Sequence, residues 1–233
     1  MENRFKLELQ KLCAAGDIPI TEQQLEQMYT YYCRLKEENE KYNLTALTTP
    51  EDAALKHFYD SIVPCSIIPP DTSLVDVGSG GGFPAAPIKI MRPDISVTAM
   101  EASQKKCTFI EMAARSAGIE IQTINARAEE ESQGERRETF DVLTARAVSS
   151  LPMLIEITSA LVRPGGMLLY YKADYAQELK AAGEGLRKLQ LIFDRAIPLP
   201  SETLAHFVLV FRKEGAAPSS LPRRFAQIKK KPL

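Results

Sequence analysis

The sequence lacks several features that mark common classes of protein. No apolar run reaches the roughly 18 to 20 residues that a membrane-spanning helix needs. The first ten residues, MENRFKLELQ, hold no apolar signal segment, so we expect a cytoplasmic protein without a membrane partner. Cys13, Cys33, Cys65 and Cys107 show neither CxxC nor CxxH spacing. We therefore expect buried free thiols, and neither a disulfide framework nor a metal site.

A large net charge is also absent, which argues against a protein that coats nucleic acid over its whole surface. The net charge is −1 over 233 residues. Between Arg212 and Leu233, however, seven basic residues face one acid, Glu214, so the remainder of the chain is acidic. A basic tail on an acidic body is typical of a polyanion partner. Lysines that only keep a terminus solvated explain the same pattern.

The first part of the chain, residues 1–70, has the pattern of a helical extension. Thr21 and Gln24 form a capping box, and apolar residues follow it at helical spacing. A further helix is expected from about residue 51 to 68, ended by two prolines. We expect an α/β domain over 71–214, then a linker at 215–222 and a basic tail, which together form 215–233.

From residue 71 onward, short apolar strands alternate with helices. The expected strands are SLVDVG (73–78), ISVTAME (95–101), IEIQTIN (119–125), FDVLTAR (140–146), MLLYYKA (167–173), LIFDRAIPL (191–199) and HFVLVFRK (206–213). Alternation of this kind predicts a doubly wound, Rossmann-like sheet with helices on both faces. The last two strands have no helix between them, so they predict a hairpin and an antiparallel end to the sheet.

Glycines cluster directly after the first of these strands, in LVDVGSGGGFPAAP. Gly78, Gly80, Gly81 and Gly82 therefore belong at the carboxyl edge of the sheet, where doubly wound folds bind ligands. Glu101, at the end of the second strand, is placed to accept hydrogen bonds from ribose hydroxyls. Together, the glycine loop and this acid indicate an adenosine-type cofactor. The alternative is a glycine-rich turn that only packs tightly.

Two cofactors share this geometry, a nicotinamide dinucleotide and S-adenosylmethionine. The dinucleotide pattern GxGxxG needs glycine where Phe83 stands, and Pro84 removes an N–H that a pyrophosphate would use. These residues favour S-adenosylmethionine. The segment NARAEE lies just past the third strand, and we assign its Ala128 and Glu129 to the adenine edge of the cofactor. The alternative for Glu129 is an acid of a surface loop that binds no ligand.

Two motifs that the sequence lacks restrict which atom could accept a methyl group from this cofactor. The fourth strand runs into TARAVSS, not into the (D/N)PP(Y/F) of amine methylation, and Cys65 lies upstream of the cofactor strand. A ring nitrogen, an oxygen or a carboxylate remains. Arg146 would hold the methionine carboxylate or the substrate, or form a structural ion pair. Lys172 would bind RNA or remain solvated. His57, with Asp60 and Ser61 on the same helix face, would reach the site or only pack.

Several separate motifs, in order from Asn43 to the C-terminus, resemble the bacterial RsmG (GidB) family. They are NLTALTTPEDAALKHFYDS, LVDVGSGGGFPAAPIKI, MEASQKKCTFI, ARAEE, ARAVSSLPMLIE and IKKKPL. The resemblance implies S-adenosylmethionine-dependent methylation of guanine N7 in 16S ribosomal RNA. It also implies cofactor contacts at Gly78, Phe83, the Ala128–Glu129 pair and Arg146. Glu101 fills a position where the family more often has aspartate.

The partner implied is 16S ribosomal RNA or a small-subunit particle, and we expect a monomer. Two other functions remain open from the sequence. One is a ribosome-assembly factor that keeps a vestigial cofactor pocket, against which the intact glycine loop argues. The other is a nicotinamide oxidoreductase, which Phe83 disfavours.

Overall fold

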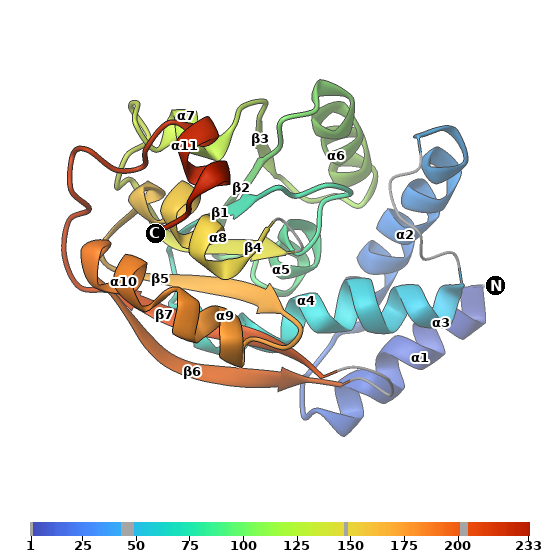
Figure 1. Ribbon diagram of the computed structural model, residues 1–233. Coiled ribbons are helices and arrows are strands. Elements are labelled where there is room, and N and C mark those ends of the chain that lie inside the picture. The colour runs from blue at the N-terminus through green and yellow to red at the C-terminus, as the bar shows by residue number, and fades with distance from the viewer. Residues whose placement is uncertain (1, 43–48, 147–148, 201–204) are drawn as a thin grey trace. The chain divides into compact units, whose positions relative to one another are not determined.

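The computed structural model describes residues 2–42, 49–146, 149–200 and 205–233 (Figure 1). Two parts of the motifs above, residues 43–48 and 147–148, lie outside this range. The chain divides into two compact units, Met1–Asp71 with Ser79–Asn125, and Thr72–Gly78 with Ala126–Leu233.

The strands form a seven-stranded sheet in the order β3-β2-β1-β4-β5-β7-β6. Their bounds are β1 Ser73–Val77, β2 Ser96–Met100, β3 Gln122–Ile124, β4 Phe140–Arg146, β5 Val162–Lys172, β6 Leu191–Leu199 and β7 His206–Lys213. β7 is antiparallel to both β5 and β6, whereas β4 is parallel to β1 and β5. The predicted doubly wound sheet with an antiparallel end is confirmed.

The first unit joins N-terminal helices to β2, β3 and two helices of the α/β domain. Its elements are α1 Glu2–Ala15, α2 Glu22–Tyr42, α3 Pro50–Asp52, the π-helix η1 Ala53–Tyr59, α4 Asp60–Ile62, the 3₁₀-helix η2 Val63–Ile67, α5 Ala85–Met91 and α6 Gln104–Ser116. The capping box is confirmed, because Thr21 N donates to Gln24 Oε1 (2.8 Å) and Gln24 N donates to Thr21 Oγ1 (3.2 Å). One continuous helix over 51–68 was expected, and the structure replaces it by this composite of α, π and 3₁₀ segments.

The second unit carries β1 and β4 to β7 with the remaining helices. These are α7 Ala128–Glu131, α8 Leu151–Thr158, the 3₁₀-helix η3 Ser159–Leu161, α9 Ala176–Ala181, α10 Gly183–Lys188 and α11 Phe225–Lys230. In Figure 1, α8, α9 and α10 lie in front of β4, β5 and β7. β5 begins at Val162, five residues before the expected strand 167–173, so its first part includes residues 163–166. A register shift against β4 and the positive φ of Gly165 (82°) accommodate them.

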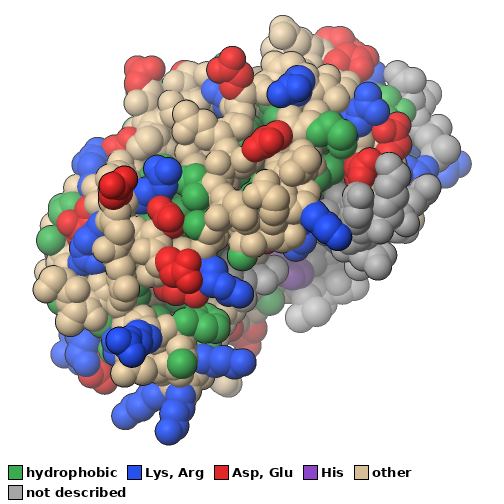
Figure 2. Space-filling view, turned by 90° about the horizontal axis from the view of Figure 1, so that it is seen from above, with side chains coloured by type: hydrophobic (Ala, Val, Ile, Leu, Met, Phe, Trp, Pro, Cys, Tyr) green, Lys and Arg blue, Asp and Glu red, His purple; other side chains and the backbone are tan. Residues whose placement is uncertain are grey.

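Basic side chains are unevenly distributed over the face that Figure 2 shows. In Figure 2, exposed Lys and Arg side chains gather toward one end of the visible face. Among the described residues, no helix combines the length and the apolar character that crossing a bilayer requires.

Candidate functional site

The glycine loop after β1 turns sharply because its backbone enters the left-handed region three times. Gly78 has φ 71°, Gly80 has φ 56° and Gly82 has φ 86°. Within the first unit, the carbonyl of Ser79 accepts hydrogen bonds from Gly82 N (2.8 Å) and Phe83 N (2.9 Å). Residues with a Cβ rarely adopt these φ values, so the turn requires glycine at these positions. Gly78 and Gly80 are half-buried, and their main chain remains accessible to a ligand.

Glu101 is tied to this loop by its carboxylate. Oε2 accepts a hydrogen bond from Gly80 N and Oε1 accepts one from Ser103 N, both at 3.0 Å. A carboxylate has about four acceptor positions, so about two remain for other donors. The predicted ribose contact is therefore chemically compatible with the observed bonds. Glu101 also fixes the loop, a role that sequence reasoning missed.

Asn125, which follows β3, is a second polar group that sequence reasoning left unassigned. Its Nδ2 donates to the carbonyl of Glu101 at 3.0 Å, and Glu101 N donates to Ile124 O at 3.0 Å. These bonds hold the ends of β2 and β3 together. Asparagine directly before the ARAEE motif was the available signal.

Gly81 and Gly82 pack against α2, and the packing is tighter at Gly82. Tyr31 Oη donates to Gly81 O at 3.0 Å in a buried contact. A Cβ added at Gly82 would lie 1.9 Å from that hydroxyl oxygen, and one at Gly81 would lie 3.1 Å from Leu35 Cδ1. The tight-packing alternative therefore explains Gly82 within the first unit, whereas at Gly81 the contact is the flexible tip of Leu35.

Phe83 and His57 lie together in an aromatic cluster. Their rings stack with centroids 4.7 Å apart, and the rings of Phe58 and Tyr31 meet Phe83 edge-on at 5.2 and 5.8 Å. Phe83 is 5% exposed and His57 9% exposed. Because the Phe83 ring is enclosed by these side chains, the expected cofactor contact at this residue would have to involve its main chain. Ser61 donates its hydroxyl hydrogen bond to the carbonyl of His57.

In the second unit, β1 and β4 end side by side. Val77 pairs with Ala145 in parallel register, and Arg146 pairs with Tyr171 of β5. Gly78 and Arg146 come directly after the first of these pairs, so both lie at the carboxyl edge of neighbouring strands, as predicted. Arg146 is half-buried there.

Lys172, the last residue of β5, is bound by neighbouring groups and is only 13% exposed. Its Nζ lies 2.7 Å from Glu178 Oε2 and donates to Ser149 O at 3.0 Å. The same Glu178 oxygen accepts a hydrogen bond from Leu151 N at 2.5 Å. Lys172 thus links the end of β5 to the start of α8 and to α9, a contact that strand patterns do not reveal.

Ala128 and Glu129 open α7. Ala128 is buried, Glu129 is half-buried, and the preceding N-cap residue Arg127 is exposed. Glu129 is therefore partly accessible to a ligand, whereas Ala128 is only 5% exposed.

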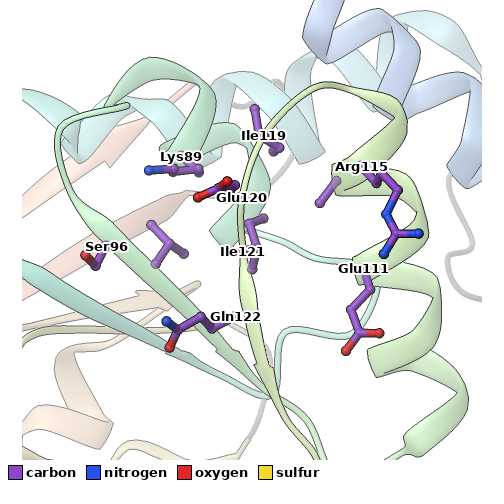
Figure 3. Close-up of a pocket in the computed structure, with 10 residues that line it drawn as sticks. Lys89, Ser96, Glu111, Arg115, Ile119, Glu120, Ile121 and Gln122 are labelled. Carbon is purple, nitrogen blue, oxygen red and sulfur yellow. The ribbon is translucent and has the colours of Figure 1, made fainter.

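A pocket of about 450 Å³ lies elsewhere in the first unit (Figure 3). It is lined by Lys89, Ser96, Val97, Glu111, Ala114, Arg115, Ile119, Glu120, Ile121 and Gln122. Ser96 and Gln122 begin β2 and β3, so the pocket opens at the amino ends of these strands. It contains none of the predicted site residues, and doubly wound sheets bind ligands at the other edge.

The cysteines are free thiols, of which Cys13, Cys65 and Cys107 are buried and Cys33 is partly exposed. Burial raises the pKa of the Cys65 thiol to about 12, so this residue is protonated at neutral pH and a poor nucleophile. Within the described parts of the chain, no group of three or more His, Cys, Asp and Glu side chains is placed to hold a metal ion.

Comparison with known families decides between the cofactor interpretations. The family model described as rRNA small subunit methyltransferase G (GidB) matches residues 24–200. The chain belongs to this family. Proteins named ribosomal RNA small subunit methyltransferase G are similar to it along nearly their whole length. The one from Lactobacillus delbrueckii subsp. bulgaricus is 38% identical over 224 residues, 92% of each chain. That from Streptococcus pneumoniae is 36% identical over 231 residues, 95% of this chain and 97% of the relative.

Solved structures show the same fold at lower identity. The ribosomal protein L11 methylase of Lactobacillus delbrueckii subsp. bulgaricus superposes with a TM-score of 0.52 and 21% identity, covering 68% of this chain and 79% of that one. The GidB family assignment therefore comes from sequence, and the structural likeness supports the fold alone.

Proposed function

We propose that this GidB protein transfers the methyl group of S-adenosylmethionine to N7 of one guanine in 16S ribosomal RNA. The observation that carries the proposal is the family match over residues 24–200, which includes the glycine loop, Glu101 and Arg146. We propose that the protein acts as a cytoplasmic monomer on ribosomal RNA or a small-subunit particle.

The cofactor would be held mainly by main chain and one carboxylate. When bound, S-adenosylmethionine supplies an electrophilic methyl group on a sulfonium. Glu101, already fixed by Gly80 N and Ser103 N, would accept hydrogen bonds from the ribose hydroxyls. The main chain at Gly78, Gly80 and Phe83 would line the cofactor, and Ala128 with Glu129 would contact the adenine.

The acceptor nitrogen places few demands on acid–base chemistry. Guanine N7 carries an exposed lone pair, so no general base has to remove a proton before transfer. Catalysis then depends on holding the acceptor in line with the methyl group. Arg146, at the carboxyl end of β4, would hold the methionine carboxylate or orient the guanine.

Lys172 and His57 would contribute by position. Lys172 binds Ser149, three residues after Arg146 in the sequence, and Glu178. His57 supports the glycine loop through its stacking on Phe83. We propose that both residues act on the reaction through these neighbours.

The test uses labelled S-adenosylmethionine with protein-free 16S RNA and with small-subunit particles. We expect label at a single guanine, located by aniline cleavage, which breaks the chain at N7-methylguanine. Arg146→Ala should fold normally and lose most of the transfer activity. Wild-type-like turnover in that variant would remove Arg146 from the mechanism. Calorimetry that detects no S-adenosylmethionine binding by the wild-type protein would favour an assembly factor.

A further inference from the structure

The C-terminal segment, residues 215–233, is held against the second unit by buried polar contacts. Glu156 of α8 is fully buried, and Arg223 binds it with both arms of its guanidinium, Nε to Oε1 at 2.6 Å and Nη2 to Oε2 at 2.7 Å. Leu233 N donates to the same carboxylate at 3.2 Å. The contacts with Glu156 fix the placement of this segment at Arg223 and at Leu233. The segment contains five basic residues and no acid.

A second set of contacts fixes the start of the segment. The Arg137 guanidinium donates to the carbonyls of Ala217 (2.6 Å), Pro218 (3.0 Å) and Leu221 (2.7 Å), and Gln133 Nε2 donates to Pro222 O at 2.6 Å. Ala217 and Leu221 are buried. The stretch predicted to be a linker is thus anchored at Ala217, Pro218, Leu221 and Pro222.

This anchoring presents α11 with one buried and one exposed side. Ile228 is fully buried, whereas Phe225 is 38% exposed. The Arg127 guanidinium lies 5.9 Å from the centre of the Phe225 ring, beside α7 (Figure 1). Arg224, Lys229 and Lys230 are also exposed, and in the described chain none of these three side chains forms an ion pair. We call Arg127 and the exposed residues of α11 with Arg224 the C-terminal platform.

We propose that the C-terminal platform binds a single-stranded segment of the ribosomal RNA substrate. An exposed aromatic ring with an arginine against it suits stacking on an unpaired base, and the neighbouring cations suit the phosphates. Arg127 directly precedes Ala128, which is proposed to contact the adenine, so the platform adjoins that part of the chain. The inference rests on the proposed function, because it assigns the RNA of that same reaction.

Nearby acids restrict the basic area to α11 itself. Glu131 of α7 pairs with Arg136 at 3.1 Å, and Glu156 is covered by Arg223. Glu129 and Glu130 remain on the α7 side. An RNA strand would therefore follow α11 and meet α7 only at Arg127.

The test measures binding of 16S RNA by the full chain at several salt concentrations. Phe225→Ala should weaken binding about 10-fold, because stacking on an aromatic ring contributes about 5- to 150-fold per base. Phe225→Trp should retain binding. Replacing both Lys229 and Lys230 by Gln should lower the slope of log affinity against log salt by about 1.4, since each phosphate contact on a single strand contributes about 0.7.

A matched control removes two exposed cations from the same unit at α9 and α10. Lys180→Gln with Arg187→Gln changes the net charge equally and should leave the salt slope near the wild-type value. S-adenosylmethionine affinity, measured by calorimetry, should be unchanged in every variant.

The outcomes separate this inference from the proposed function. If the platform variants bind RNA as the wild type does, while cofactor binding and methylation are intact, the platform is wrong and the function stands. Loss of cofactor affinity in Phe225→Ala, or platform-dependent binding to anionic lipid vesicles in place of RNA, would also overturn it. A wild-type protein that binds neither cofactor nor RNA would overturn both.

Discussion

Replacing Gly82 by Ala tests whether this glycine serves packing, as the structure indicates. The added Cβ would lie 1.9 Å from Tyr31 Oη and 3.0 Å from Cζ of the same ring. The residue would also keep a φ of 86°, which L side chains rarely adopt. Gly81→Ala is the matched control, because its nearest contact is the flexible tip of Leu35 at 3.1 Å.

The expected cost combines two terms. Left-handed backbone costs a residue with a Cβ about 1–2 kcal/mol, and overpacking costs about 1–3 kcal/mol. Gly82→Ala should therefore lower the free energy of unfolding by about 2–5 kcal/mol. Tyr31→Phe should cost about 1–3 kcal/mol, because it leaves the buried carbonyl of Gly81 without that donor. The double variant should be no less stable than Gly82→Ala alone, since one hydroxyl causes both the clash and the hydrogen bond.

Urea unfolding of the wild type, the three variants of the cycle and Gly81→Ala, all without cofactor, measures these differences. The predicted non-additivity is a coupling energy of about 1–3 kcal/mol in a double-mutant cycle. Additive losses, or a Gly82→Ala cost no larger than that of Gly81→Ala, would refute the packing explanation. Calorimetry with S-adenosylmethionine would then show whether Gly82 serves the ligand.

The remaining predictions concern three carboxylates. Glu101→Gln should weaken S-adenosylmethionine binding, measured by calorimetry, about 10- to 150-fold. The negative charge is lost, and the amide nitrogen that replaces one carboxylate oxygen cannot accept a hydrogen bond from a backbone N–H group. For Glu138, burial alone raises the pKa, but hydrogen bonds from Lys213 and Ala217 N outweigh it and the pKa lies below its usual 4.5. The ionised Glu138 carboxylate therefore stabilises the fold above that pH, and this stabilisation is lost on acidification. In urea titrations, Glu138→Gln should lower the free energy of unfolding by about 3–5 kcal/mol at pH 7, and by progressively less below pH about 4.5. Arg223→Met should cost about 3–5 kcal/mol in thermal or urea unfolding by leaving Glu156 buried without its guanidinium, and adding Glu156→Met should recover most of that loss.

Strand and helix patterns in the sequence predicted most of the second half of the fold. β4 matches the expected stretch 140–146 because it is a largely buried apolar run, bounded by the polar loop before Phe140. The π-helix η1 was not predictable, since its apolar residues also satisfy ordinary helical spacing. The start of β5 was missed because Pro164 and two glycines normally indicate a turn, whereas here a register shift against β4 accommodates them.

The site was predictable where it depends on the order of strands. Residues that follow parallel strands meet at one edge, which placed Gly78 beside Arg146 without any side-chain information. The roles of Gly82 and Phe83 were only partly predictable, because both depend on residues of α2 and η1 more than 20 positions earlier. The family resemblance supplied the acceptor atom, which no contact in the chain specifies.

The C-terminal segment shows why composition alone misjudged residues 215–222. Small residues, serines and prolines are typical of linkers because they bury little apolar surface themselves. In this protein the segment is fixed by a residue outside it. Arg137 donates hydrogen bonds to three main-chain carbonyls of the segment, and main-chain carbonyls are present whatever the side chains are. Glu156 likewise requires a cation because a buried carboxylate without one is costly, and Arg223 lies 67 positions away in the sequence. The basic tail is therefore held in a defined place, with Arg223 and Leu233 N bound to the buried acid, whereas Arg224, Lys229 and Lys230 are exposed.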